Sequence, residues 1–302
     1  MAIVIFGSIN MDLVARVPRL PSPGETLIGH DFFTAPGGKG ANQAVACARL
    51  GAATRMIGRV GDDAFRAMLR ESLAEYGVDT AGVAIQPGAP SGVAVITVDD
   101  AAENEIIVVP GANGVVGRED LDRLEAALDG ARVLLLQLET PLDVVVAAAE
   151  MGCRRGVTVI LDPAPAQPLP EALYAAVDIL TPNESEAAAL VGFSLDDPDA
   201  IARASQTLLS RGVRSVIVKL GGKGVFWSNG LESAHFPTFP VEAVDSVGAG
   251  DAFNGGLAVG LSDGLDMAAA IRWGLAAGAL SVTKSGAQPS MPDRAAVAAL
   301  LG

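Results

Sequence analysis

The sequence predicts an α/β protein in which helices flank a mainly parallel central sheet, with a second, small β-sheet acting as a lid. Two observations support this prediction. Apolar strand-like runs alternate with helical patterns over most of the chain, which is typical of βαβ units. Four short strand-like pieces interrupt this alternation and indicate a separate sheet. We therefore expect one α/β domain over residues 1–302, with lid strands inserted at about 12–35 and 91–110.

The strands of the central sheet are predicted from short apolar runs. The chain starts with Ala2 to Gly7, and continuous apolarity of this kind fits a strand buried on both faces. Similar runs follow at Thr54–Ile57, Val133–Gln137, Thr158–Leu161, Asp178–Leu180 and Ser215–Lys219. Helical patterns lie between and after them at Lys39–Leu50, Asp63–Tyr76, Asp120–Ala127, Leu142–Arg155, Glu184–Val191, Ala200–Arg211 and Ala252–Leu261.

The lid is predicted from two pairs of strand-like pieces. The first pair is Leu13–Val17 and Thr26–Phe33, and the second is Gly92–Val98 and Glu105–Val109. Four short strands leave unpaired edges, which are a liability unless something covers them. We therefore expect the lid to carry the contact of a homodimer.

A glycine-rich turn near the carboxyl end of the chain has the features of a phosphoryl-transfer site. Gly248, Ala249 and Gly250 leave room for a ligand against the backbone, and a helix follows at once. The first N–H groups of a helix have no intrahelical partner and attract anions. Asp251 has the wrong charge to bind an anion, but it could take a proton from an attacking hydroxyl. We interpret the turn as an anion hole and Asp251 as a general base.

A second glycine-rich segment, Pro36 to Ala44, leads into the first predicted helix. The simple alternative is an ordinary helix start with polar surface residues. Because two consecutive glycines cost backbone entropy with no evident gain in packing, we expect a ligand contact here.

Polar residues follow several predicted strands, and the carboxyl ends of parallel strands are where ligands gather. Each has a simpler explanation when taken alone: Asn10 and Asp12 fit an Asx turn, Glu139 a carboxylate at a helix start, and Asn183 an N-cap. Their common placement is what indicates a site. The other polar segments at this edge are Asp162, Thr181 to Glu186, and Gly221 to Gly224.

Composition and missing motifs exclude several classes of protein. A net charge of −14 argues against binding to nucleic acid or anionic membranes. Cys47 and Cys153 lie in apolar helical patterns and are predicted as buried free thiols of a reducing compartment. With neither a secretory signal nor a membrane-spanning stretch, the expected location is cytoplasmic. The sequence has no Walker loop, no dinucleotide fingerprint after the first strand, no zinc-binding Cys/His spacing and no G-x-S-x-G elbow.

Two motifs resemble those of the ribokinase-like (pfkB) carbohydrate kinases. They are Gly37-Gly38-Lys39-Gly40-Ala41-Asn42-Gln43-Ala44 and Asp245-Ser246-Val247-Gly248-Ala249-Gly250-Asp251. The resemblance extends to Asp162–Ala166, Thr181–Glu186 and Gly286–Ser290, and so covers most of the chain. It implies a kinase that transfers the γ-phosphoryl group of ATP to the primary 5-hydroxyl of D-ribose. Another sugar or a nucleoside remains an alternative acceptor, and a non-catalytic sugar-binding regulator is disfavoured because the base and the glycine turn are both present.

The resemblance also assigns roles to individual residues. The sugar would be bound by Asn10, Asp12, Gly38, Lys39, Asn42, Glu139 and Asp251. The nucleotide would be bound by Asn183, Lys219, Gly221, Gly222, Lys223, Gly224 and Gly250. Mg²⁺ would be held through water by Asn183 and Glu186. A K⁺ ion beside the anion hole would be held by Asp245, Val247, Ser281, Lys284, Gly286 and Ser290.

The chain departs from the family pattern at a few positions. Ser246 and Ala252 are small replacements beside the glycine turn, and we expect both to be tolerated. Leu275 stands where a histidine can lie near the adenine, which leaves the preferred nucleotide base open. Lys219 replaces a common threonine in the nucleotide loop, and a cation there could contact a phosphate.

Overall fold

The computed structural model describes residues 2–101, 103–197 and 199–302. Its main sheet has the strand order β13-β12-β11-β10-β9-β8-β1-β4-β5, parallel from β5 to β11 and antiparallel from β11 to β13. The bounds are β1 (Ala2–Phe6), β4 (Ala53–Gly61), β5 (Asp79–Gln86), β8 (Ala131–Leu136), β9 (Thr158–Leu161), β10 (Ile179–Leu180), β11 (Ser215–Lys219), β12 (Val225–Ser228) and β13 (Ser233–Phe236). The predicted mainly parallel sheet is confirmed.

Helices cover both faces of this sheet because its central strands are apolar on both sides. In β1, Ile3 and Ile5 join one core, whereas Val4 and Phe6 join the other. The first core packs against α1 (Lys39–Arg49), α2 (Phe65–Glu75), α8 (Ala249–Ser262), α9 (Met267–Ser281) and α10 (Arg294–Leu301). The second packs against α3 (Arg118–Ala127), α4 (Leu142–Arg154), α5 (Glu171–Ala176), α6 (Glu184–Val191) and α7 (Ala200–Ser210).

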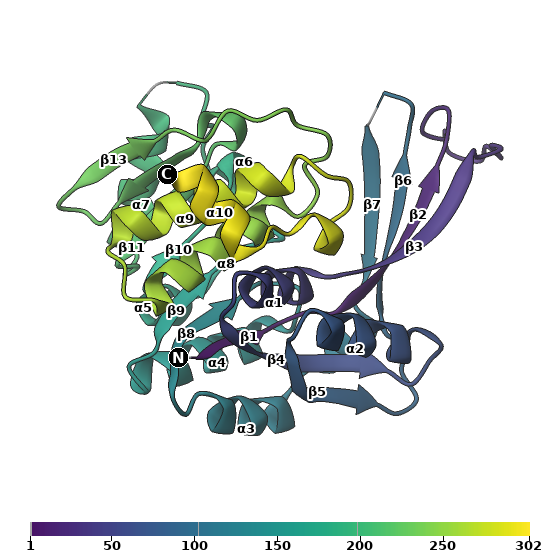
Figure 1. Cartoon of the computed structure of the whole chain (residues 1–302), viewed down its shortest axis with the longest axis horizontal. Helices are drawn as coiled ribbons and strands as arrows, with labels where there is room; N and C mark the ends of the chain where they lie inside the picture. The colour runs from purple at the N-terminus through teal and green to yellow at the C-terminus, as the bar shows by residue number, and fades with distance from the viewer. Residues whose placement is uncertain (1, 102, 198) are drawn as a thin grey trace.

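A small separate sheet stands beside the main one, as predicted (Figure 1). Its strand order is β3-β2-β6-β7, with only the β2–β6 pair parallel. The strands are β2 (Asn10–Arg16), β3 (Asp31–Gly37), β6 (Gly92–Val98) and β7 (Asn104–Val109). Figure 1 shows all four extending away from the helices of the main body.

The first pair of predicted lid strands needs correction. The strand expected at Thr26–Phe33 runs over Asp31–Gly37 instead. Pro36 was assigned to the glycine-rich segment before the first helix, but β3 lies at the edge of its sheet, where a missing N–H is tolerated. The strand expected at Leu13–Val17 begins earlier, at Asn10, so the Asx turn is not formed.

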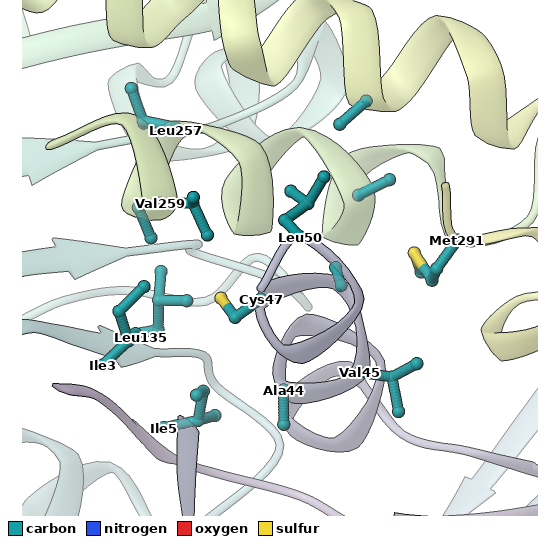
Figure 2. Close-up of a cluster of buried hydrophobic side chains, with 14 of the residues drawn as sticks. Ile3, Ile5, Ala44, Val45, Cys47, Leu50, Leu135, Leu257, Val259 and Met291 are labelled. Carbon is teal, nitrogen blue, oxygen red and sulfur yellow. The ribbon is translucent and has the colours of Figure 1, made fainter. Parts of the chain in front are cut away.

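The core between α1 and α8 sets the geometry of the site. Figure 2 shows α1 side chains, including Ala44 and Cys47, on the side of Ile3, Ile5 and Leu135. A Cβ at Gly255 of α8 would lie 2.5 Å from the Cβ of Ala46, so the two helices meet without side chains between them. This close packing brings the first turns of both helices to the same end of the sheet.

The cysteines differ from the prediction. Cys47 is buried, but Cys153 is exposed, so the expectation of two buried thiols was wrong. Cys153 lies on the solvent side of α4, whereas the apolar residues near it in the sequence face the sheet. In the ranges that the structure describes, no helix is long and apolar enough to cross a membrane.

Candidate active site

The glycine turn forms the start of α8. Gly248 has φ 77° and ψ 0°, a left-handed conformation that favours glycine, and a Cβ there would lie 3.1 Å from the Cα of Ala287. Helix α8 begins at Ala249, so its first N–H groups lack intrahelical acceptors. The turn therefore presents positive potential at its mouth, as an anion hole requires.

Asp251 lies in the first turn of α8 and is only 6% exposed. Its Oδ2 accepts a hydrogen bond of 3.0 Å from Nδ2 of Asn42, and its Oδ1 accepts one of 3.0 Å from Nε2 of Gln43. Burial raises the pKa of Asp251 to about 6, with Lys39 opposing this rise and Asp162 adding to it. The carboxylate is therefore ionised at neutral pH and basic enough to accept a proton.

Asn10 and Asp12 lie two residues apart on β2 and share one face of the small sheet. Asn113 holds Asn10, because its Nδ2 donates to Oδ1 of Asn10 at 2.7 Å. Burial, together with the charges of Glu139 and Asp251, raises the pKa of Asp12 to about 7. Hydroxyl groups of a ligand that donate to this carboxylate would stabilise its charged form, so Asp12 is suited to accepting hydrogen bonds from a ligand.

The second glycine segment places Lys39 and Glu139 together. Oε2 of Glu139 accepts from the backbone N–H of Lys39 at 3.1 Å and from the hydroxyl of Ser8. A Cβ at Gly38 would lie 2.7 Å from the backbone N of Asn10, and one at Gly40 would lie 2.7 Å from that of Ser8. The expectation that these glycines bring no packing gain was therefore wrong.

A polar cavity of about 280 Å³ lies in front of Asp251. Lys39 and Lys219 line it together with the carboxylates of Asp162 and Glu186 and the turn Gly248–Gly250. Burial lowers the pKa of Lys39, but the nearby carboxylates outweigh burial and raise it overall. Lys39 is therefore a cation, and it shares the cavity with Lys219 and the anion-hole turn.

A more apolar cavity of about 410 Å³ adjoins the first, sharing Lys219 and Gly250 with it. Its walls include Phe239, Phe253 and Leu275. Gly221, Gly222 and Gly224 border this cavity, as the nucleotide assignment requires. Lys223 does not, because its ammonium lies on the surface 4.0 Å from Glu184. The two cavities together offer an apolar slot beside a polar one that holds both lysines and carboxylates.

Asn183 and Glu186 cap α6 and also face the polar cavity. Oδ1 of Asn183 accepts from the N–H of Glu186, and Oε2 of Glu186 accepts from the N–H of Asn183, both at 2.8 Å. Among the described residues, no three His, Cys, Asp or Glu side chains converge as a metal site. The Oδ1 of Asn183 also accepts from the hydroxyl of Ser185, so both side chains are already hydrogen-bonded and fit an ion that keeps most of its waters.

The residues assigned to K⁺ come from two loops that the structure joins. Oδ2 of Asp245 accepts from the N–H of Gly286 at 2.8 Å, and its Oδ1 accepts from that of Val247 at 3.0 Å. Ser281 and Ser290, which lie close to Gly286 in the sequence, are buried, whereas Lys284 is exposed. One carboxylate with several carbonyl oxygens is a donor set that suits a monovalent cation.

Three contributors to the site were not assigned a role from the sequence: Gln43, Asn113 and Asp162. Gln43 is a polar side chain inside a fully buried stretch of α1, which is the signal that could have identified it. Asp162 follows β9 at the ligand edge of the sheet, and Asn113 lies in a short helical turn, η1 (Gly111–Val115), without a distinctive pattern.

Comparison with known proteins extends this description. Residues 2–294 match the model of the pfkB family of carbohydrate kinases. A Haemophilus influenzae protein described as ribokinase is 42% identical over 97% of this chain and 95% of its own. A Salmonella typhi deoxyribokinase is 39% identical over 97% of this chain and 96% of its own. The structure of Arabidopsis thaliana ribokinase with ribose and ATP superimposes with a TM-score of 0.91 at 36% identity, covering 99% of this chain and 98% of the other.

Proposed function

The chain belongs to the pfkB family of carbohydrate kinases, and we propose that it transfers the γ-phosphoryl group of ATP to the 5-hydroxyl of D-ribose, giving D-ribose 5-phosphate. It is a phosphotransferase acting on a sugar hydroxyl. The observation that carries the proposal is the position of Asp251, a buried carboxylate in the first turn of α8 that faces the polar cavity lined by Lys39 and Lys219. A base and an anion hole on one helix turn are what in-line phosphoryl transfer needs.

The sugar would lie between the small sheet and α1. Asn10 and Asp12 approach it from β2, while Asn42, Lys39 and Glu139 approach from the opposite side together with Gly38. Sugar hydroxyls donate and accept hydrogen bonds at once, so a mixture of carboxylates, amides and an ammonium can bind each of them. Asp251 then takes the proton of the 5-hydroxyl as its oxygen attacks phosphorus.

The charge that develops on the transferred group would be stabilised by the first N–H groups of α8. These groups are fixed by the fold before reaction, so no reorganisation is needed when charge develops. Lys219 and Lys39 add positive charge in the same cavity. The nucleotide base would occupy the apolar cavity beside Leu275, with its phosphates passing Gly221, Gly222 and Gly224.

Two metal ions would assist this site. Asn183 and Glu186 would hold Mg²⁺ through water, and this ion would neutralise charge on the ATP phosphates. Asp245 and Ser290 with the carbonyls of Val247, Ser281, Lys284 and Gly286 would hold K⁺. The K⁺ ion would shape the loop on which Gly248 depends, and would not touch phosphate. Since the reaction consumes ATP, the cytoplasm remains the expected compartment.

The small sheet would act as a lid and as the contact of a homodimer. One row across its four strands is wholly apolar: Phe33, Val14, Ile96 and Ile106 are neighbours in register. This row lies on the same face as Asp12. Its member on β2, Val14, is two residues beyond Asp12 and farther from Asn10. Ile106 is 56% exposed and Phe33 is 41% exposed, so a bound sugar near Asp12 would leave them in water. A second copy of the chain would cover such an apolar row.

A coupled ADP-release assay over a panel of acceptors tests the proposed function. D-Ribose should give the highest kcat/KM among ribose, 2-deoxyribose, fructose and adenosine. The 2-deoxyribose arm matters because one relative is described as a deoxyribokinase. Preference for adenosine or fructose, or no acceptor-dependent ADP release, would contradict the proposal.

A further inference from the structure

Asp162 connects the two ends of the candidate site. It follows β9, is 2% exposed and uses both carboxylate oxygens. Oδ1 accepts from Nζ of Lys219 at 2.8 Å, and Oδ2 accepts from Nε2 of Gln43 at 3.1 Å. The same Nε2 donates to Oδ1 of Asp251 at 3.0 Å. One chain of contacts therefore runs from Lys219 through Asp162 and Gln43 to the base.

The lysine at one end of this chain lies beside the anion hole. A Cβ built on Gly250 would be 3.3 Å from Nζ of Lys219, so the ammonium lies directly over the second residue of α8. The backbone of Lys219 is fixed by a 2.8 Å hydrogen bond from its N–H to the carbonyl of Pro182. Its side chain, however, shares the cavity with another carboxylate, that of Glu186. The contact with Asp162 holds the ammonium beside Gly250, and its charge also acts on the carboxylate of Glu186.

The amide at the other end is fixed by the same carboxylate. Oε1 of Gln43 accepts from Nε2 of Gln137 at 2.7 Å, which sets which end of the amide faces Asp251. Its NH₂ group then lies between Asp162 and Asp251 and donates to both. Asp162 thereby directs the amide that contacts Oδ1 of the base.

Only a side chain with two acceptor atoms can make both contacts of Asp162. Lys219 and Gln43 are both donors, and an asparagine at position 162 would turn its own NH₂ group toward one of them. A carboxylate is therefore required at position 162, where it lines the polar cavity and accepts from both donors.

We propose that Asp162 is a positioning residue that holds Lys219 beside the anion hole and directs Gln43 onto Asp251, so that one buried carboxylate aligns the phosphoryl-binding cation with the base. The inference rests on the proposed function, because it assumes that the ATP phosphates occupy the polar cavity. It adds a residue that acts through two others.

A double-mutant cycle tests this proposal. The variants are Asp162→Asn, Lys219→Met and the two combined, studied for binding of a non-hydrolysable ATP analogue by calorimetry and for kcat with ribose. Asp162→Asn and Lys219→Met should each weaken analogue binding about ten- to a hundred-fold, the range for a lost charge-assisted hydrogen bond. The double variant should bind the analogue no more weakly than Lys219→Met alone, because Asp162 acts through Lys219.

Two further variants complete the test, one as a control and one as an independent check. Asp178→Asn removes a carboxylate that pairs with Arg214 at the opposite end of the same sheet, and it should leave analogue binding and kcat unchanged. Gln43→Met should lower kcat while leaving analogue affinity unchanged, because Lys219 stays held. This second variant decides the matter if Asp162→Asn does not fold.

Analogue binding that Asp162→Asn leaves unchanged, or losses that multiply in the double variant, would overturn the proposal, as would weakened analogue binding in Gln43→Met. The analogue titration needs no sugar. If the cycle holds while ribose is not phosphorylated, the sugar assignment fails and the positioning role of Asp162 stands.

Discussion

Nδ2 of Asn42 donates a 3.0 Å hydrogen bond to Oδ2 of Asp251. The two residues come from the glycine-rich segments near opposite ends of the sequence, and they meet because α1 and α8 pack against each other through small residues. The contact links the predicted sugar-binding segment to the predicted base. It also affects the chemistry of the base, because hydrogen bonds from Asn42 and Gln43 lower the pKa of Asp251 against the larger effect of burial.

This contact predicts a pH dependence. With a pKa of about 6, Asp251 loses its basic form as the pH falls, so kcat/KM should drop tenfold per pH unit well below pH 6 and level off above it. Asn42→Ala removes a hydrogen bond to the charged form and should move this limb toward neutral pH. Because the pKa of Asp12 is raised to about 7, the profile should also be recorded for Asp12→Asn, where the remaining limb belongs to Asp251. A limb unmoved by Asn42→Ala would argue against the assignment.

Asp12 should cost the unliganded protein stability at alkaline pH. Its folded pKa of about 7 lies above the ordinary value of 3.8, so the folded state favours the protonated acid. The penalty for ionisation grows as the pH rises through this window and is complete above pH 7. Asp12→Asn should therefore raise the free energy of unfolding by about 1–3 kcal/mol at pH 8, with no gain below pH 4, and should raise KM for the sugar. Urea unfolding at both pH values checks the first part. Equal stability of the two proteins at pH 8 would contradict it.

Much of this fold follows from local patterns, and the exceptions have physical causes. The buried runs at β9 and β11 predict their strands to the residue, since continuous apolarity marks a strand covered on both faces. β5 is an edge strand with alternating exposure and was not predicted. The long C-terminal helix α9 was also missed, because small residues give it little amphipathic contrast.

In the site, too, some residues could be identified from local patterns and others could not. Asp251 and its turn could be identified from sequence because glycines before a helix and a carboxylate form a local pattern. The role of Asp162 could not, because its partners Lys219 and Gln43 lie 57 and 119 residues away. Contacts over such separations depend on the strand order, which no local pattern shows.

The dimer proposal predicts a difference between adjacent residues of β7. Ile106 belongs to the apolar row on the face of Asp12, whereas Ile107 lies on the opposite face beside Val95. Ile106→Lys should shift the protein from dimer to monomer at micromolar concentration, and Ile107→Lys should not. Both isoleucines are exposed, so neither change should disturb the core. Light scattering measures the outcome, and a monomeric wild-type chain would refute the dimer.

The K⁺ proposal predicts activation that depends on Asp245. Replacing K⁺ by Na⁺ should lower kcat several-fold, because the ion shapes the loop beside Gly248. Asp245→Asn should remove most of the difference between the two ions. Asp293→Asn is a matched control, because Asp293 caps α10 through a 2.8 Å hydrogen bond from the N–H of Ala296 and lies in no assigned site. Equal activity of the wild type in both salts would remove the cation from the account.

The most direct test of the central claim is the ribose-dependent rate of ADP release by Asp251→Asn. The side chain keeps its size but loses its basicity, so kcat should fall by about 10²–10⁴-fold or more, with ribose binding retained in calorimetry. Asp266→Asn is the control, since Asp266 also lies at a helix start and accepts from the N–H of Ala269 at 2.8 Å, but away from the cavity. Its kcat should match the wild type. A kcat for Asp251→Asn within a few-fold of the wild-type value would contradict the assignment of Asp251 as the base.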